Sequence, residues 1–202
     1  IKPVSTELSG WKSSPTGDYL TADGVLLEVL LQIAYSTDHF HIDWRLPTST
    51  QTYRFAARVP KGRESHLLPL LQNALAANFN LKATWQPQDK DVYVLRVSDN
   101  ELVKRGAAAA DQESSFRMMR GTATAKRKPL ADLTRFLTNA LGLLVIDETG
   151  LSGEYNWELP YQPGQPEVTL QALKDRLGLE LVKGRRSVKM LVVEPAEASK
   201  AP

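Results

Sequence analysis

The stretch from residue 25 to residue 44, VLLEVLLQIAYSTDHFHIDW, combines two hydrophobic periodicities. In its first part apolar residues recur three and four positions apart, which predicts an amphipathic helix over 25–36 with Asp23 as the N-cap. In its second part apolar and polar residues alternate from 39 to 44, which predicts a half-buried strand. The stretch 130–147, LADLTRFLTNALGLLVID, repeats this helix-then-strand order in the second half of the chain. The repetition indicates an internal duplication.

The surrounding sequence extends the same pattern in both halves. The first half continues with an alternating strand, a helix and two strands separated by a polar turn, at 53–59, 67–78, 81–86 and 92–97. The second half continues in the same order at 155–159, 168–177, 179–183 and 188–193. The turns of the two closing hairpins are expected at 87–91 and 184–187. Each half therefore reads β-α-β-β-α-β-β, which predicts an α+β fold in which two helices cover a small mixed sheet as a two-layer sandwich.

This reading divides the chain into five parts. Residues 1–18 form an extended lead-in with Trp11 as an anchor, and residues 19–98 form the first repeat. Residues 99–116 are a linker, residues 117–195 form the second repeat, and residues 196–202 are a flexible tail.

Composition limits the classes of function. The chain has 202 residues with 42% hydrophobic and 24% charged residues, which is ordinary globular composition. It contains no cysteine, which excludes disulfides, zinc-thiolate sites and cysteine nucleophiles. The net charge is only +2, so no strong electrostatic footprint for nucleic acid exists at the level of the whole chain. We therefore expect no nucleic-acid partner. No apolar run is long enough to span a bilayer, so we also expect no membrane insertion.

Two groups of side chains invite a chemical interpretation. His39 and His41 lie two apart on a predicted strand and, with Asp38 or Asp43, could hold a metal, but a solvent-facing pair explains them as well. Glu148 and Glu154 flank a loop at which paired carboxylates could act as acid and base. No group that would complete an active site converges on them. We therefore predict no catalytic, metal or cofactor site.

The stretch 145–157, VIDETGLSGEYNW, resembles the signature V-D-x-T-G-L-x-G-x-Y-[DN]-[FW] of the DUF3738 family. This is a bacterial family of unknown function, soil-associated and abundant in Acidobacteria. Further similar segments extend the resemblance over essentially the whole chain, at 1–3, 30–35, 53–60, 170–181 and 187–195. Residues 43–47 depart from the family pattern, because they replace its G-G-P-x-W motif.

The resemblance implies export, because members of the family commonly carry an N-terminal signal peptide. Others follow a membrane-bound metallopeptidase-like sensor module. The chain begins at Ile1, as it would after removal of such a peptide, so we expect a periplasmic or secreted protein. The order of helices and strands is also similar, more faintly, to the short N-terminal domain of secretins and TonB-dependent receptors, a protein-binding module of the bacterial periplasm.

We therefore expect a non-catalytic extracytoplasmic module for protein interaction or sensing, with a protein partner in the cell envelope. The expected mechanism is strand addition at the closing strand of each repeat. The alternative is a small-molecule binder with its pocket between the two repeats. The candidate partner-binding residues are Val94, Leu95, Val188, Met190, Leu191 and Val192. The signature loop is the next candidate, with Asp147, Thr149, Gly150, Leu151, Gly153 and Tyr155.

Overall fold

The computed structural model describes residues 1–5, 10–14, 17–109 and 111–196, and shows an α+β protein, as expected. The predicted tail and parts of the predicted lead-in lie outside the described residues. The chain divides into two compact units. Unit 1 comprises residues 1–88 together with the chain from residue 188 onward, and unit 2 comprises residues 89–187.

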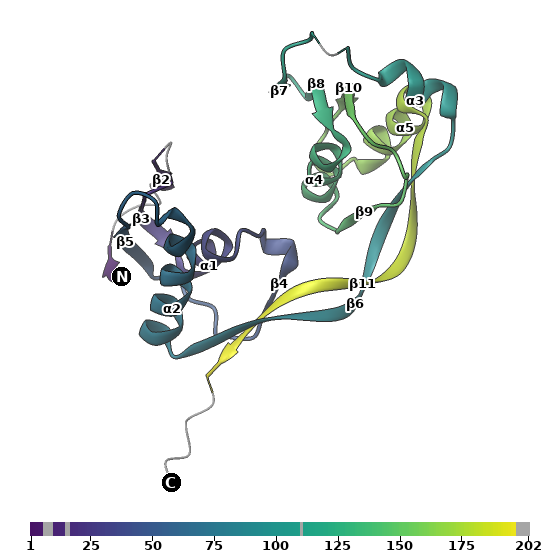
Figure 1. The fold of residues 1–202 in the computed structure, drawn as a ribbon. Helices are drawn as coiled ribbons and strands as arrows, with labels where there is room; N and C mark the ends of the chain where they lie inside the picture. Colours follow the sequence, from purple (N-terminus) through teal and green to yellow (C-terminus); the bar gives the residue numbers. More distant parts are fainter. Residues whose placement is uncertain (6–9, 15–16, 110, 197–202) are drawn as a thin grey trace. The chain divides into compact units, whose positions relative to one another are not determined.

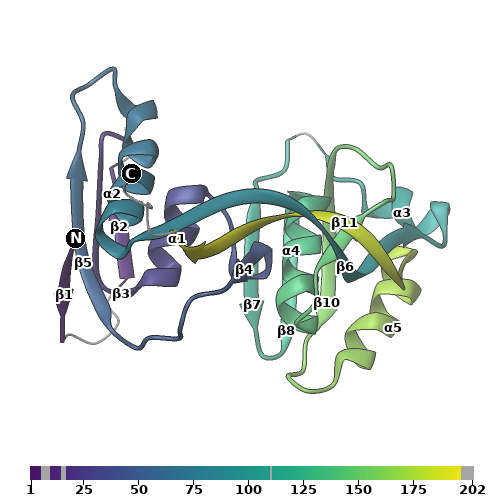
Figure 2. The same ribbon diagram turned by 90° about the horizontal axis from the view of Figure 1, so that it is seen from below.

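Unit 1 contains an antiparallel sheet with two helices on one face (Figure 2). The sheet has the order β1-β5-β3-β2, from β1 (Lys2–Val4), β5 (Thr52–Arg58), β3 (Tyr19–Leu26) and β2 (Gly10–Ser13). The helices are α1 (Leu27–Tyr35) and α2 (Leu67–Phe79). The 3-10 turn η1 (His39–His41) leads into β4 (Ile42–Trp44), and the 3-10 turn η2 (Glu64–His66) leads into α2.

From its first strand onward, unit 2 has the order of elements that unit 1 has after β1: two strands, a helix, two strands and a helix (Figure 1). Its antiparallel sheet has the order β10-β8-β7, from β10 (Glu154–Pro160), β8 (Thr122–Pro129) and β7 (Ser115–Met119). Its other elements are α3 (Asn100–Gly106), α4 (Leu130–Leu141), β9 (Val145–Asp147) and α5 (Pro166–Leu177). The expected linker at 99–116 therefore contains a helix and the start of a strand.

The two units even share an irregularity. In unit 1 the β3–β5 pairing shifts register after Ala22, and in unit 2 the β8–β10 pairing shifts at the corresponding place, after Ala125. A residue with positive φ lies inside each shift, Gly24 at 61° and Arg127 at 48°. Such a bulge bends the strand and re-aims its end. In both units the strand then leads directly into the helix that covers the sheet.

β6 (Leu81–Val97) and β11 (Leu179–Pro195) are uninterrupted strands that each belong to both units. The N-terminal part of β6 lies in unit 1 and its C-terminal part in unit 2, whereas β11 passes the other way. They are the inner strands of a sheet with the order β4-β11-β6-β9. In unit 1, β4 pairs in parallel with β11, and in unit 2, β9 pairs in parallel with β6.

The hairpins expected at 87–91 and 184–187 are therefore wrong, and each predicted pair of strands is one strand. Gly184 shows why its turn signal misled. A Cβ on this residue would lie 3.3 Å from Cγ2 of Val94, so the glycine allows β11 to pass close to β6 and does not make a turn. The single mixed sheet expected in each repeat is likewise wrong, because each unit has an antiparallel sheet of its own beside its share of the β4-β11-β6-β9 sheet.

Each unit has its own hydrophobic core, built from the predicted apolar faces. In unit 1, Leu30 of α1 and Leu75 of α2 are fully buried together with Leu191 of β11. In unit 2, Leu133 of α4 and Leu173 of α5 are fully buried against the sheet. The expected N-cap Asp23 is instead in β3, where its carboxylate accepts hydrogen bonds from Arg54.

Candidate functional site: the β7 edge

The predicted partner-binding residues lie inside the sheet and not at its edge. β11, with Val188, Met190, Leu191 and Val192, lies between β4 and β6. β6, with Val94 and Leu95, lies between β11 and β9. All six side chains are at most 6% exposed. The expectation of an exposed edge is wrong for Val94 and Leu95, because β9 pairs with β6 there. It is also wrong for Leu191 and Val192, because β4 pairs with β11 there.

The signature loop forms a network of turns. The Asp147 carboxylate accepts hydrogen bonds from the backbone N–H of Thr149 at 2.9 Å and from its hydroxyl at 2.7 Å. Gly150 and Gly153 have φ of 68° and 103°, which glycine adopts without strain. Leu151 packs against the core of unit 2, and the hydroxyl of Tyr155 donates to the carbonyl of Ser152. The hydrogen bonds and the packing of this loop therefore stabilise a local turn.

The carboxylates beside the loop and the histidines of unit 1 are similarly engaged. Glu148 accepts from Arg186 and Arg96, and the hydrogen bond from Arg186 is the main cause that lowers the pKa of Glu148 to about 2. His41 Nδ1 lies 2.9 Å from Asp38 Oδ1, a contact that lowers the pKa of Asp38. In the part of the chain that the structure describes, no group of three or more His, Cys, Asp or Glu side chains could hold a metal ion.

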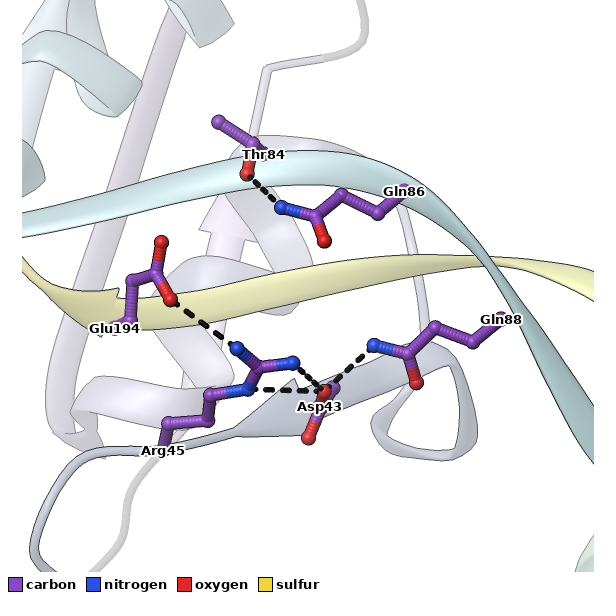
Figure 3. A network of polar contacts seen from close by, with 6 residues as sticks. All are labelled: Asp43, Arg45, Thr84, Gln86, Gln88 and Glu194. Carbon is purple, nitrogen blue, oxygen red and sulfur yellow. Dashed lines mark hydrogen bonds and ion pairs between the residues drawn. The ribbon is translucent and has the colours of Figure 1, made fainter.

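A network of polar side chains in unit 1 connects β4 with the long strands β6 and β11 (Figure 3). Arg45, next after β4, donates to Asp43 at 2.9 Å and to Glu194 of β11 at 3.3 Å. Gln88 of β6 donates to the same Asp43 oxygen at 2.7 Å. Because the network joins β4 to both long strands, we infer that it stabilises the pairing of this short edge strand.

β7 is an edge strand of unit 2. It is one of the two outer strands of the β10-β8-β7 sheet, and at the other outer strand Ala107 bridges to Tyr155. Three large apolar side chains of β7 are exposed: Phe116 by 48%, Met118 by 49% and Met119 by 64%. Natural sheets usually protect their edges with charges, prolines or covering segments, so an edge strand with three exposed apolar side chains indicates a pairing site.

The hairpin turn between β7 and β8 determines which backbone groups of β7 face outward. Arg120 and Gly121 both have positive φ, 50° and 75°, which is typical of a two-residue type I′ turn. The residues flanking such a turn exchange both backbone hydrogen bonds, and the pattern alternates along the ladder. In the observed register, Met118 and Phe116 are therefore the positions whose N–H and C=O groups point away from β8.

An apolar groove lies along one face of this edge, between β7 and α4. It has a volume of about 310 Å³, and its lining includes the aromatic rings of Phe116, Phe136 and Tyr161. Phe136 lies at the centre of the aromatic cluster, 6.5 Å from Phe116 and 5.9 Å from Tyr161 between ring centroids. Asp132 on the rim is paired with Arg135 at 2.8 Å and with Lys128 at 3.8 Å.

The opposite face of the edge is polar and hollowed, with a volume of about 410 Å³. Arg117 of β7 and Lys126 of β8 line this hollow, and Glu113 lines it as well. Arg117 and Lys126 are exposed and have no ion pair among the described residues.

A groove occupies the corresponding place in unit 1, between β2 and α1, with a volume of about 590 Å³. Trp11 stands where Phe116 stands in unit 2, since it pairs with Ala22 as Phe116 pairs with Ala125. Trp11, predicted as an anchor, is 52% exposed. The groove is lined by uncharged residues of α1, Val29 and Gln32, at the positions that correspond to Asp132 and Arg135.

Sequence reasoning missed the β7 site: Ser115 and Phe116 were assigned to the linker at 99–116, and no strand was assigned to residues 117–119 at the start of the second repeat. One signal was available: Arg120-Gly121 separates the run SFRMM from the alternating TATAK, as in a tight hairpin. That signal locates a hairpin but does not show which of its strands lies at the edge.

In a comparison with known protein families, residues 28–196 match the family described as "Protein of unknown function (DUF3738)". The chain belongs to the DUF3738 family. The match to DUF3738 runs from α1 to β11 and includes β7 and its groove. No curated protein and no solved structure matches the chain. Among the described residues of this DUF3738 protein, no helix is both long and apolar enough to cross a bilayer.

Proposed function

We propose that this protein is a non-catalytic interaction module that binds an extended segment of a protein partner by strand addition to β7. The observation that carries the proposal is the combination of an outer strand with exposed Phe116, Met118 and Met119. In strand addition, backbone hydrogen bonds supply affinity and pockets for alternate side chains supply specificity. In β7 the outward backbone groups of Phe116 and Met118 provide the hydrogen bonds, and the groove beside them provides the pocket for side chains.

The contacts of the carboxylates at the signature loop support a non-catalytic role. The carboxylates of Asp147 and Glu148 are used in a turn and in ion pairs. Glu154 is paired with Arg127. A general acid or base needs a carboxylate placed for proton transfer to a substrate, and these side chains serve the fold.

The proposed location is the periplasm or the exterior of the cell, with a partner in the cell envelope. The family resemblance supports this location, since its members commonly carry signal peptides. Fractionation of the native host, with antibody detection of the protein, tests it: a cytoplasmic signal alone would contradict the proposal.

The test of strand addition uses residue-resolved amide exchange. The protein is used to isolate an envelope partner, and the purified partner is then added to isotope-labelled protein. We expect the amides of Phe116 and Met118 to be protected in the complex, because they become hydrogen-bonded to the added strand. Exchange in β7 that is unchanged by a bound partner would contradict the proposal.

A matched pair of variants controls this experiment. Met118→Pro removes an outward N–H and leaves the ladder to β8 unaffected, so binding is expected to be lost while α4 and α5 stay protected. The control variant is Leu70→Ser, which changes an exposed apolar residue of α2. Proline is not used at this position, because Leu70→Pro would disrupt the helix. The Leu70→Ser variant is expected to bind as well as the unchanged protein.

A second candidate function is small-molecule binding in the groove of unit 1. Its volume of about 590 Å³ lies within the range of ligand pockets, and Tyr19, Leu20 and Ile33 contribute to its lining. A thermal-shift screen tests it, because a ligand raises the melting temperature by mass action. The screen is repeated with Ile33→Asp, which places a charge in the groove and is expected to abolish any shift.

A further inference from the structure

We infer that the segment that adds to β7 is acidic, with aspartate or glutamate alternating with large apolar side chains. This inference rests on the proposed function and names the chemistry of the partner. Side chains of an added strand alternate between the two faces of the sheet. The segment must therefore match a different surface on each face of the β7 edge.

On the face covered by α4 the surface is apolar. Phe116 and Met118 project to this face and line the groove with Phe136, Ala140 and Tyr161. The nearby charges already have partners, because Asp132 is paired with both Arg135 and Lys128. Burial of an aromatic or long aliphatic side chain is favourable here, since it removes apolar surface on both sides from water.

The hollow on the open face carries more cations than carboxylates. Arg117 lies in the middle of β7 and Lys126 lies opposite Ser115 on β8, and both line the hollow together with Met119. The side chains of Arg117 and Lys126 are exposed and have no ion pair in the described ranges. Glu113 is the carboxylate in the lining, and Glu158 lies on β10, the far strand of the sheet. The charge complement of the hollow is therefore an acidic partner.

The same charges disfavour a second copy of this chain as the occupant. Antiparallel pairing of β7 with β7 would bring two copies of Arg117 and of Lys126 onto one face. Like charges directly opposite each other destabilise a strand pair. A partner with acidic side chains at alternate positions removes this repulsion and replaces it with attraction.

The probe is a fluorescently labelled peptide in which aspartate alternates with leucine and phenylalanine, and binding is measured by anisotropy. A second peptide carries asparagine in place of aspartate. A third keeps the aspartates and has methylated backbone amides along the edge that would pair with β7. The double variant Arg117→Gln/Lys126→Gln is compared with Lys61→Gln/Lys82→Gln, which removes two exposed lysines of unit 1 and changes the net charge equally.

We expect the aspartate peptide to bind, and its affinity to fall about fivefold in Arg117→Gln/Lys126→Gln and by less than about twofold in the control, as for exposed ion pairs. Added salt should weaken binding to the unchanged protein by screening these pairs. The methylated peptide should not bind.

Other outcomes separate the two ideas. Equal binding of the aspartate and asparagine peptides, lost on methylation, would overturn the acidic partner and leave strand addition supported. Binding that survives methylation and depends on Arg117 would overturn strand addition. Absence of binding for all three peptides would overturn both. Self-association of the protein that is lost in Met118→Pro would show that the occupant is a second copy.

Discussion

Ending the chain at Ser187 is expected to unfold unit 1 and to leave unit 2 folded. Unit 2 is one continuous segment from residue 89 to residue 187, so this truncation removes none of it. Unit 1 is discontinuous, because its share of β11 begins at Val188. The truncation removes the strand on which β4 pairs in parallel.

The size of the effect follows from burial. Leu191 and Val193 are fully buried members of the unit 1 core. Burying each such side chain stabilises the fold by about 1.5–3 kcal/mol, which gives roughly 3–6 kcal/mol for the two. The lost backbone hydrogen bonds to β4 add about 0.5–1.5 kcal/mol each. A domain is stable by about 5–15 kcal/mol in total, so the loss is comparable with the whole stability of unit 1.

Hydrogen exchange read by mass spectrometry gives the result for each helix. In the truncated chain, α1 and α2 should exchange as an unfolded chain does, whereas α4 and α5 should keep their protection. A synthetic peptide of residues 188–196 should restore protection in α1 and α2, and at one hundred times its Kd it adds about 2.7 kcal/mol. The same peptide with Leu191→Asp should not restore it.

The opposite pattern would refute the reasoning. Had the predicted hairpins formed, residues 188–193 would complete the second repeat. Truncation would then expose α4 and α5 and spare α1 and α2. Protection of α1 and α2 that survives truncation would also show that β11 contributes little to unit 1.

Four further substitutions, all in unit 2, have expected outcomes. Gly121→Ala should destabilise unit 2 by about 1–2 kcal/mol, because φ is positive at this residue and a Cβ would lie 3.2 Å from the Tyr161 carbonyl oxygen. Arg120→Asn, which suits the same turn, should stabilise unit 2 by up to about 1 kcal/mol. Chemical denaturation measures both changes. Leu133→Ala, at a fully buried position of α4, should cost about 2–5 kcal/mol in the same measurement, and a smaller loss would mean that the core collapses around the site. Glu148→Gln should destabilise unit 2 near neutral pH, since the folded-state pKa of Glu148 is lowered from 4.5 to about 2. The ion pairs of Glu148 therefore stabilise the fold above pH 4.5 and are lost as the pH falls toward 2. Over that window, the free energies of unfolding of the variant and the unchanged protein should converge in urea titrations. A difference in unfolding free energy that does not depend on pH would contradict this role of Glu148.

Most helices and strands could be predicted from the sequence, because their apolar residues follow the period of one element. Leu71 and Leu75 share a face of α2, and Leu133 and Leu137 share a face of α4, and all four are buried as expected. The strand expected at 39–44 shows the limit of this reasoning. Asp38 caps a 3-10 turn over the two histidines, so only Ile42–Trp44 is a strand.

The candidate site was less accessible to sequence reasoning. Residues 188–193 are strongly apolar, which predicted a strand correctly, but an apolar strand can lie at an edge or in the middle of a sheet. The structure places it between β4 and β6, and places β7 at an edge. Whether a strand is exposed depends on its neighbours, and these come from distant parts of the chain.

The sequence by itself determined the α+β class, the faces of the helices, the glycine turns of the signature loop and membership of the DUF3738 family. These properties depend on residues that are close in the chain. Only the tertiary structure decided which strand completes which unit. The ion pairs at the ends of the short strands agree with the observed pairing. Arg45, next after β4, is paired with Glu194 of β11. Glu148, next after β9, is paired with Arg96 of β6. Without the exchange, Arg96 would meet Arg45 and Glu194 would meet Glu148, so repulsion between distant residues disfavours the local hairpins that the turn residues alone predict.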